Sequence, residues 1–248
     1  GSGRMVVASW KNGKFAYSGE DVGFVAMITP TNYIPKPFPI MPEQSDDQLI
    51  HHLSSPSHVY QIHAQREILR RGTTDRTVSA LSDLATSNQQ PLHGRVAAIY
   101  TLKQLLGTDA KDFLIKFSKQ EKIREHALRA LTDREEGLKD LDISPFVEAL
   151  TDTNPRVRAQ ALICLGRIGN PAAGEVIIPH TLRDTNYPKP VGEPLYKQAD
   201  PGRVLSHLAI RALEACQATE ACLDAVDGPY ADGAFWALKY MHNKTAVD

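Results

Sequence analysis

Hydrophobic residues recur at helical spacing along most of the chain, most clearly in the stretch 154–170, NPRVRAQALICLGRIGN. Val157, Ala161, Leu165 and Ile168 lie three or four residues apart. This spacing places side chains on one face of an α-helix. A second apolar flank of the same helix consists of Ala159, Leu162 and Cys164. The stretch therefore predicts a helix that is buried on more than one side and needs helical neighbours.

Both ends of this helix carry boundary signals. Asn154 can accept a hydrogen bond from a free amide at the helix start, and Pro155 suits the first helical position. Gly169 is a natural helix stop. We expect the rest of the chain to be organised around this helix and its looser copies.

From Ser45 to the end the pattern stays helical, and the predicted helices fall into six pairs. The second helices of the pairs are expected to begin near Ser57, Pro91, Gln120, Asn154, Asp200 and Tyr230. Successive starts lie about 30 to 34 residues apart, except for the longer step from Asn154 to Asp200. Self-similarity at this period is typical of a solenoid. The predicted fold is therefore mainly α, an α-solenoid over residues 45–248.

Several of these helices have recognisable start signals. Ser45, followed three residues later by Gln48, forms a capping-box pattern. Ser144 before Pro145 and Asp200 before Pro201 are predicted caps. The segments GEVIIPHTLRD and DAKDFLIKFSKQ are each expected to form the first helix of a pair.

The longer step contains a proline-rich insertion, Thr185–Ala199, between the two helices of the fifth pair. A loop of this length in a compact array is either functional or poorly ordered. Its polar and aromatic side chains make it a candidate interaction loop, with the candidate residues Tyr187, Lys189, Glu193, Tyr196 and Lys197.

The first 44 residues follow a different pattern. Two β-prone runs, GRMVVASW and FVAMITP, flank a turn-rich stretch that contains Asn12-Gly13. They predict a short hairpin within residues 1–30, although an irregular extended arm stays an alternative. Residues 31–44 contain four prolines and predict an extended connector. The two runs are apolar on both sides, so the strands should require cover on both faces.

Composition narrows the class of protein. With 248 residues and 42% hydrophobic content, the chain can bury a sizeable core as one elongated domain. A net charge of −1 argues against a nucleic-acid-binding partner, which would favour a basic stripe. No run of 18 apolar residues is present, so no membrane insertion of this segment is expected. Three cysteines are too few for a disulfide framework or a cysteine-rich zinc site, and no haem-attachment motif occurs.

The run 154–170 closely resembles a HEAT-type, armadillo-like repeat helix, and IREHALRAL resembles a weaker copy. The tetratricopeptide signature is missing from the first helices. The resemblance covers roughly residues 45–248. It implies an α-solenoid, but HEAT motifs specify fold and not function.

The order of parts suggests a narrower resemblance. Residues 1–30, the proline-rich connector, Ser55-Pro-Ser-His and the run AQREILRRG at 64–72 stand in the order found in certain exported bacterial membrane-bound dehydrogenase proteins. In those proteins a HEAT array follows a β-propeller. The resemblance implies that residues 1–30 are the remnant of a propeller blade and that the location is periplasmic or extracytoplasmic. None of the family's catalytic positions lies in this chain, so the segment itself is expected to be non-catalytic.

No cofactor-binding or catalytic residues are predicted. The histidines at 51, 52, 58 and 63 lack zinc-site spacing and are expected to be solvated or capping side chains. An iron-dependent hydroxylase built from HEAT repeats is rejected, because it requires His-Glu pairs and this chain has none. Arg124, Arg156, Arg158 and Arg203 are expected to pair with acids of adjacent repeats rather than to bind an anionic ligand.

The cysteines leave one question open. Cys216 and Cys222 bracket a predicted turn between helices, so they could form a disulfide in an oxidising compartment. Alternatively, they are two buried free thiols, since cysteine behaves as a small hydrophobic residue in cores. Cys164 lies among apolar residues in mid-helix and is expected to be buried and unreactive.

The leading hypothesis is a non-catalytic scaffold that binds adjacent domains of a parent chain or another protein. The alternative is an enzyme or ligand-binding domain with a groove covered by the 185–199 loop. Convergent acids or histidines with shifted pKa values in that groove would favour the alternative. A groove lined by paired salt bridges would favour the scaffold.

Overall fold

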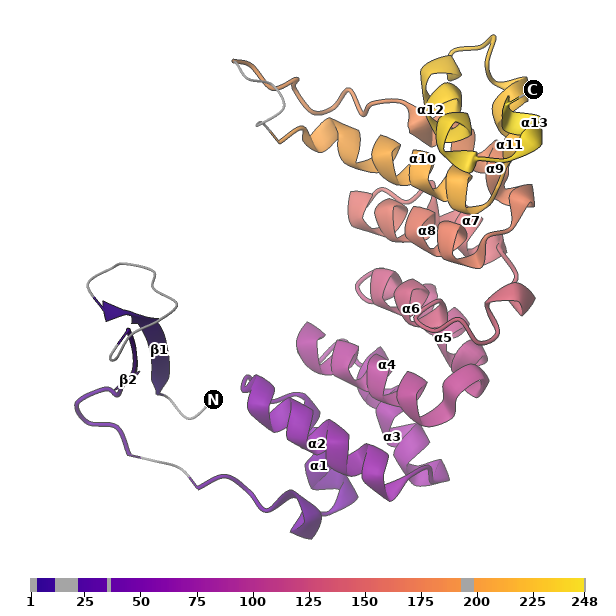
Figure 1. Ribbon diagram of the computed structural model, residues 1–248. Coiled ribbons are helices and arrows are strands. Elements are labelled where there is room, and N and C mark those ends of the chain that lie inside the picture. The colour runs from indigo at the N-terminus through magenta and orange to yellow at the C-terminus, as the bar shows by residue number, and fades with distance from the viewer. Residues whose placement is uncertain (1–3, 12–21, 35–36, 193–198, 248) are drawn as a thin grey trace.

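The structure is a computed structural model that describes residues 4–11, 22–34, 37–192 and 199–247 of the 248-residue chain. Within these residues it is an α-solenoid with a two-stranded sheet at its start, so the predicted fold class is confirmed. Figure 1 shows the helices as a curved stack, with the two strands standing away from it.

The strand pair consists of β1 (Met5–Trp10) and β2 (Gly23–Ile28). The strands are antiparallel, with Met5 opposite Ile28 and Trp10 opposite Gly23. The two predicted β runs are therefore confirmed as strands. The Asn12-Gly13 turn signal lies outside the described residues.

The helices of the described residues form six pairs that follow one another along the chain. The first members of the pairs are α1 (Asp46–Leu53), α3 (Asp75–Thr86), α5 (Lys111–Ser118), α7 (Ser144–Ala149), α9 (Gly174–Ile177) and α11 (Thr219–Asp224). The second members are α2 (His58–Arg71), α4 (Leu92–Leu106), α6 (Arg124–Leu131), α8 (Pro155–Ile168), α10 (Val204–Ala215) and α12 (Ala231–Met241). A final short helix, α13, spans Lys244–Val247.

Short 3-10 helices complete several of these elements. Within the described residues they are η2 (Met41–Glu43), η3 (Gly107–Ala110), η4 (Leu138–Asp140), η5 (Pro171–Ala173), η6 (Ile178–Thr181) and η8 (Pro201–Arg203). No helix among the described residues is long and apolar enough to cross a bilayer.

The second members pack in one row from α2 to α12, and their inward faces form a continuous core with the first members. Helix α8 lies within this row and packs on α6 and α10. Asn154 caps it by accepting a hydrogen bond from the Arg156 amide at 3.0 Å. Gly169 ends it with a left-handed φ of 70°. Val157, Ala161 and Leu165 are buried as predicted.

Three local predictions are wrong in detail. Helix α6 begins at Arg124 rather than near Gln120, because a turn precedes it in which the Ile123 amide donates to the Gln120 carbonyl at 3.2 Å. The Gln120 side chain accepts a hydrogen bond from the buried Arg95 at 2.9 Å. Ser144 is not the cap of α7 but its first residue, and its amide donates to Asp142 at 3.0 Å.

The third correction concerns the segment GEVIIPHTLRD, which does not form one helix. Helix α9 ends after four residues, and η6 continues the chain. Pro179 lies at the start of η6. Proline has no backbone N–H to donate, and its ring clashes with the carbonyl group of the preceding helical turn, so the α-helix cannot continue.

Ion pairs join neighbouring repeats, as predicted for the arginines. Arg124 contacts Asp152, and Arg156 donates two hydrogen bonds to Glu125 at 2.7 and 2.9 Å. Arg158 lies 3.7 Å from Asp184 of the next pair. Arg203 differs, because its nearest acid is Asp200 at the start of its own helix. These contacts link the third, fourth and fifth pairs along one side of the row.

Candidate functional site

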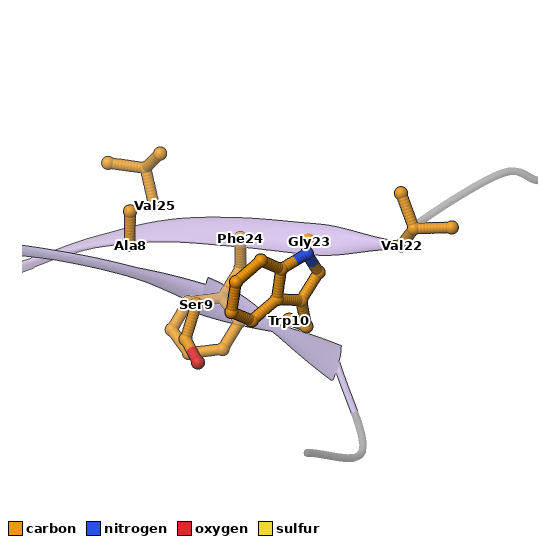
Figure 2. A pocket seen from close by; sticks show the side chains of 7 residues that line it. All are labelled: Ala8, Ser9, Trp10, Val22, Gly23, Phe24 and Val25. Carbon is orange, nitrogen blue, oxygen red and sulfur yellow. The ribbon is translucent and has the colours of Figure 1, made fainter. Parts of the chain in front are cut away.

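The strand pair is the first candidate surface, because it exposes apolar side chains on both faces. Val6 and Val25 are 66% and 75% exposed, and Met5, Trp10, Phe24, Met27 and Ile28 are also exposed. Figure 2 shows Ala8 and Val25 on one face and Ser9 and Phe24 on the opposite face. A hollow of about 550 Å³ is lined by Ala8, Ser9, Trp10, Val22, Gly23, Phe24 and Val25. Among the described residues the strands pack mainly on each other, and no helix packs closely on either face.

The second candidate surface is a groove between α10, α12 and the insertion, and it begins at a charged clamp. Arg183 donates two hydrogen bonds to the Asp200 carboxylate, at 2.9 and 3.1 Å, and a third to the Pro188 carbonyl at 3.0 Å. The hydrogen bonds from Arg183 hold the pKa of Asp200 below its ordinary value. The clamp ties the two ends of the insertion together.

A glycine allows the chain to approach itself closely at this clamp. The Asp184 amide donates to the Gly202 carbonyl at 2.9 Å. A Cβ atom at position 202 would lie 2.7 Å from the Asp184 carbonyl oxygen and 2.8 Å from Cζ of Arg183. A larger residue would therefore force the two ends of the insertion apart.

The groove itself has a volume of about 810 Å³. Basic side chains line one wall, and aromatic side chains line the other. Its lining comprises Thr181, Leu182, Arg183, Lys189, Arg203, Ser206, His207, Ile210, Arg211, Pro229, Asp232, Gly233, Trp236 and Tyr240.

The arginines of the groove are paired with carboxylates. Besides the Arg183 clamp, Arg211 lies 2.6 Å from Glu214, and Arg203 lies 3.5 Å from Asp200. Histidine and aspartate each occur once in the lining, as His207 and Asp232. A groove lined by paired salt bridges favours a scaffold over acid–base catalysis.

Two stacked aromatic rings form the α12 wall. Trp236 and Tyr240 have ring centroids 6.1 Å apart and an interplanar angle of 20°. The Lys239 ammonium lies 4.8 Å from the centre of the Trp236 ring, within range of a cation–π contact. Trp236 is 50% exposed, so a large, rigid aromatic surface faces solvent.

One residue of the predicted interaction loop, Lys189, lines this groove. Tyr187 lines a smaller neighbouring hollow of about 200 Å³ against α8 and α10. Glu193, Tyr196 and Lys197 lie outside the described residues. Their role in an interaction stays a prediction.

Sequence reasoning missed Trp236, Tyr240 and Arg211. A signal for the aromatic pair was present, because α12 carries apolar residues on two faces. Ala234, Ala237, Leu238 and Met241 are buried, and Trp236 and Tyr240 recur four residues apart on the other face. A terminal helix with two apolar faces indicates an unpartnered surface.

The three cysteines are free thiols buried in the core. Cys216 donates a weak hydrogen bond to the Leu165 carbonyl at 3.4 Å. Burial raises the pKa of Cys216 and of Cys222 to about 11. The structure holds no disulfide between Cys216 and Cys222, and their pairing in an oxidising compartment stays a prediction. Cys164 is buried, as predicted.

The histidines of the first pair have local contacts. His63 packs edge-on against Phe38 of the connector, with ring centroids 4.9 Å apart. His52 packs near Tyr60, and desolvation by burial, followed by the nearby His51, lowers its pKa. In the part of the chain that the structure describes, no three His, Cys, Asp or Glu side chains are grouped to hold a metal ion.

A family model described as HEAT repeats matches residues 114–188, from within α5 into the insertion. The HEAT-type resemblance is thus confirmed for this part of the chain. No curated protein matches the chain in sequence.

The solved structures similar to this chain include engineered and designed proteins. An engineered protein of a structural genomics consortium is 18% identical, with 82% of this chain and 84% of that chain covered and a TM-score of 0.46. A designed armadillo repeat protein is 16% identical, with 80% of this chain and 100% of that chain covered and a TM-score of 0.47.

Proposed function

We propose that the chain is a non-catalytic scaffold that binds another protein or protein domain. The observation that carries this proposal is the strand pair, whose large apolar side chains are open to solvent on both faces. Contiguous exposed apolar surface of this kind marks interaction sites in soluble proteins. The stacked helix pairs supply the extended surface on which repeat proteins bind partners.

The resemblance in sequence suggests the first partner. It is a β-propeller that precedes this segment in an exported bacterial membrane-bound dehydrogenase, and it covers the strand pair. Any dehydrogenase activity then belongs to the parent protein. In this arrangement the segment is periplasmic or otherwise extracytoplasmic, and adjacent domains of the parent chain are its main partners.

The ion pairs between repeats support the role of a rigid extension. Arg156 and Glu125 are joined by two hydrogen bonds across one repeat boundary, and Arg124 and Asp152 meet across the same boundary. Paired contacts between consecutive units limit how far they can rotate relative to one another. A partner bound at one end would therefore be held at a defined position relative to the other end.

A second candidate function is a ligand-binding or enzyme domain in which the 185–199 loop covers the groove. The observation that favours it is Lys189, which extends from that loop into the groove lining. The pairing of Arg183 and Arg211 with carboxylates weighs toward the scaffold.

The test begins with the full reading frame from which this chain comes, which should encode a β-propeller upstream. That propeller, expressed separately, should bind the chain in isothermal titration calorimetry. The double variant Val6→Lys/Val25→Lys should weaken binding at least tenfold. Val59→Lys, at an exposed valine of α2, serves as the matched control and should bind normally.

Two results would contradict the proposal. One is a propeller whose binding is unaffected by the strand substitutions. The other is catalytic turnover by the isolated chain, measured as sugar oxidation with an added quinone. A reading frame without a propeller would remove the proposed parent protein.

A further inference from the structure

Three side chains form a stripe along the α10 wall of the groove. Arg203 ends η8, and His207 and Arg211 follow at intervals of four residues. Residues four apart lie on the same face of a helix. At a rise of 1.5 Å per residue, the first and last of them are separated by about 12 Å. All three line the groove, so the stripe runs along its wall.

The arginines of this stripe keep donors available to a ligand. Asp200 already accepts two hydrogen bonds from Arg183 and one from the Gly202 amide. Arg203 only approaches Asp200, at 3.5 Å, and its side chain is 77% exposed. Arg211 has one short contact with Glu214 and a side chain that is 56% exposed. Since a guanidinium carries five N–H donors, most of these donors remain open.

The groove also differs in charge from the molecule as a whole. The chain has a net charge of −1, whereas four of the five charged residues of the lining are basic: Arg183, Lys189, Arg203 and Arg211, against Asp232. Asp200 and Glu214 beside the groove offset part of this charge through Arg183 and Arg211. Arginine forks bind carboxylates with two parallel hydrogen bonds. The wall therefore favours an occupant with carboxylate groups.

The opposite wall is apolar and held in place. Trp236 and Tyr240 present their stacked rings to the groove. Helix α12 approaches η6 closely at Gly233, where a Cβ atom would lie 2.3 Å from Cβ of Thr181. This contact fixes the aromatic wall relative to the Arg183 clamp, which follows η6 directly in the chain.

We propose that this groove binds an extended, acidic segment of a partner protein. The proposal rests on the scaffold function proposed above and gives the chemistry of a second contact surface. Side chains of an extended segment point alternately to opposite sides. Alternating acidic and apolar residues would therefore place carboxylates on the Arg203–Arg211 stripe and apolar groups on Trp236 and Tyr240.

The spacing of the stripe matches the spacing of side chains in an extended segment. Residues four apart in an extended segment are separated by about 13 Å, close to the roughly 12 Å between Arg203 and Arg211. Tryptophan, tyrosine and arginine are also the residues that most often dominate protein–protein binding energy. The groove volume of about 810 Å³ is in the usual range of binding sites.

The test uses the full chain and a fluorescein-labelled peptide of ten residues. The peptide has glutamate at alternate positions, with leucine and serine between them, and binding is followed by fluorescence anisotropy. We expect saturable binding that weakens as salt is raised, because exposed charge pairs are screened. A peptide with lysine in place of glutamate should not bind.

Substitutions locate the site. Arg203→Glu/Arg211→Glu should weaken binding of the acidic peptide at least tenfold, and Trp236→Ala should weaken it severalfold. Arg76→Glu is the matched control, since Arg76 is exposed and ion-paired with Asp47 on α1, and it should leave binding unchanged. Far-UV circular dichroism confirms that each variant is folded.

Absence of saturable binding would overturn the proposal, as would equal binding of the lysine peptide or unchanged affinity of Arg203→Glu/Arg211→Glu. Tighter binding of an oligonucleotide than of the acidic peptide would also overturn it, because the groove would then be a general polyanion site. If the peptide fails while the upstream propeller binds the strand pair, the scaffold function stands and only this inference falls.

Discussion

The strand pair and the helical array contain similar apolar side chains but place them in opposite environments. Leu165 and Phe117 of the array are fully buried, whereas the large apolar residues of β1 and β2 are open to solvent. The helix pairs between the first and the last have neighbours on both sides, while the strands pack mainly on each other. The local sequence determines whether a segment forms a helix or a strand, but its apolar side chains become buried only when another element packs on them. The strand pair therefore indicates a partner, and the array supports itself.

The first prediction tests the buried side of this comparison and has the largest expected effect. Leu165→Ala should lower the free energy of unfolding by about 2–5 kcal/mol, because the Leu165 side chain is fully buried and its truncation leaves a cavity in the core. Ile163→Ala, at an exposed position of the same helix, is the control and should change stability by about 0.5 kcal/mol or less. Chemical denaturation measures both. Equal effects would mean that α8 is not central to the core.

The second prediction concerns stability in acid, which the array should lose as the buried Glu67 loses its ion pairs with Arg70 and Arg71. Hydrogen bonds from Arg70, and then from Arg71, lower the pKa of Glu67 from 4.5 to about 2, against the opposing effect of burial. A lowered pKa in the folded state stabilises the protein above the unfolded pKa, and this stabilisation is lost as pH falls toward 2.

Glu67→Gln should therefore melt at a lower temperature than the parent near neutral pH. Its melting temperature should change less than that of the parent between about pH 5 and pH 2, because the variant lacks this titration. Thermal melting across this range measures the difference. Parallel curves for the two proteins would show that the Glu67 ion pairs do not contribute.

The third prediction has a small expected effect and concerns the contacts between repeats. Arg156→Ala removes two hydrogen bonds to Glu125, but the Arg156 side chain is largely exposed. Exposed ion pairs contribute about 0.2–1 kcal/mol, so the loss of stability should fall in that range and shrink at high salt. A loss as large as that of Leu165→Ala would show that the array depends on its ion pairs more than on its core.

Much of the array could be predicted from the sequence, because its signals act over a few residues. Ser45 and Gln48 exchange the two hydrogen bonds of a capping box, at 2.8 and 3.3 Å, as predicted. Asn154 and Gly169 bound α8 as expected. Helix α6 begins later than predicted because a turn precedes it, in which the Ile123 amide donates to the Gln120 carbonyl at 3.2 Å. The Gln120 side chain accepts a hydrogen bond from Arg95, a residue 25 positions away that the local pattern does not point to.

The groove was less predictable for the same reason. Lys189 was identified because the insertion breaks the repeat, but the other residues of the groove lining come from η6, η8, α10, α12 and the segments between them. Arg203 and Trp236 line one groove only because α10 packs on α12. The sequence around Arg203 or Trp236 does not indicate that α10 and α12 pack against each other. Patterns that span a few residues predict single helices, but they do not predict which distant helices pack together.

The most direct test of the central comparison is deletion of residues 1–30, followed by circular dichroism and thermal melting. If the strand pair serves a partner and the array supports itself, the deleted protein should keep its helical signal and melt cooperatively. Its melting temperature should be close to that of the full chain, because repeats contact mainly their neighbours. Loss of the helical signal or of cooperative melting would show instead that the strands are part of the array's own core.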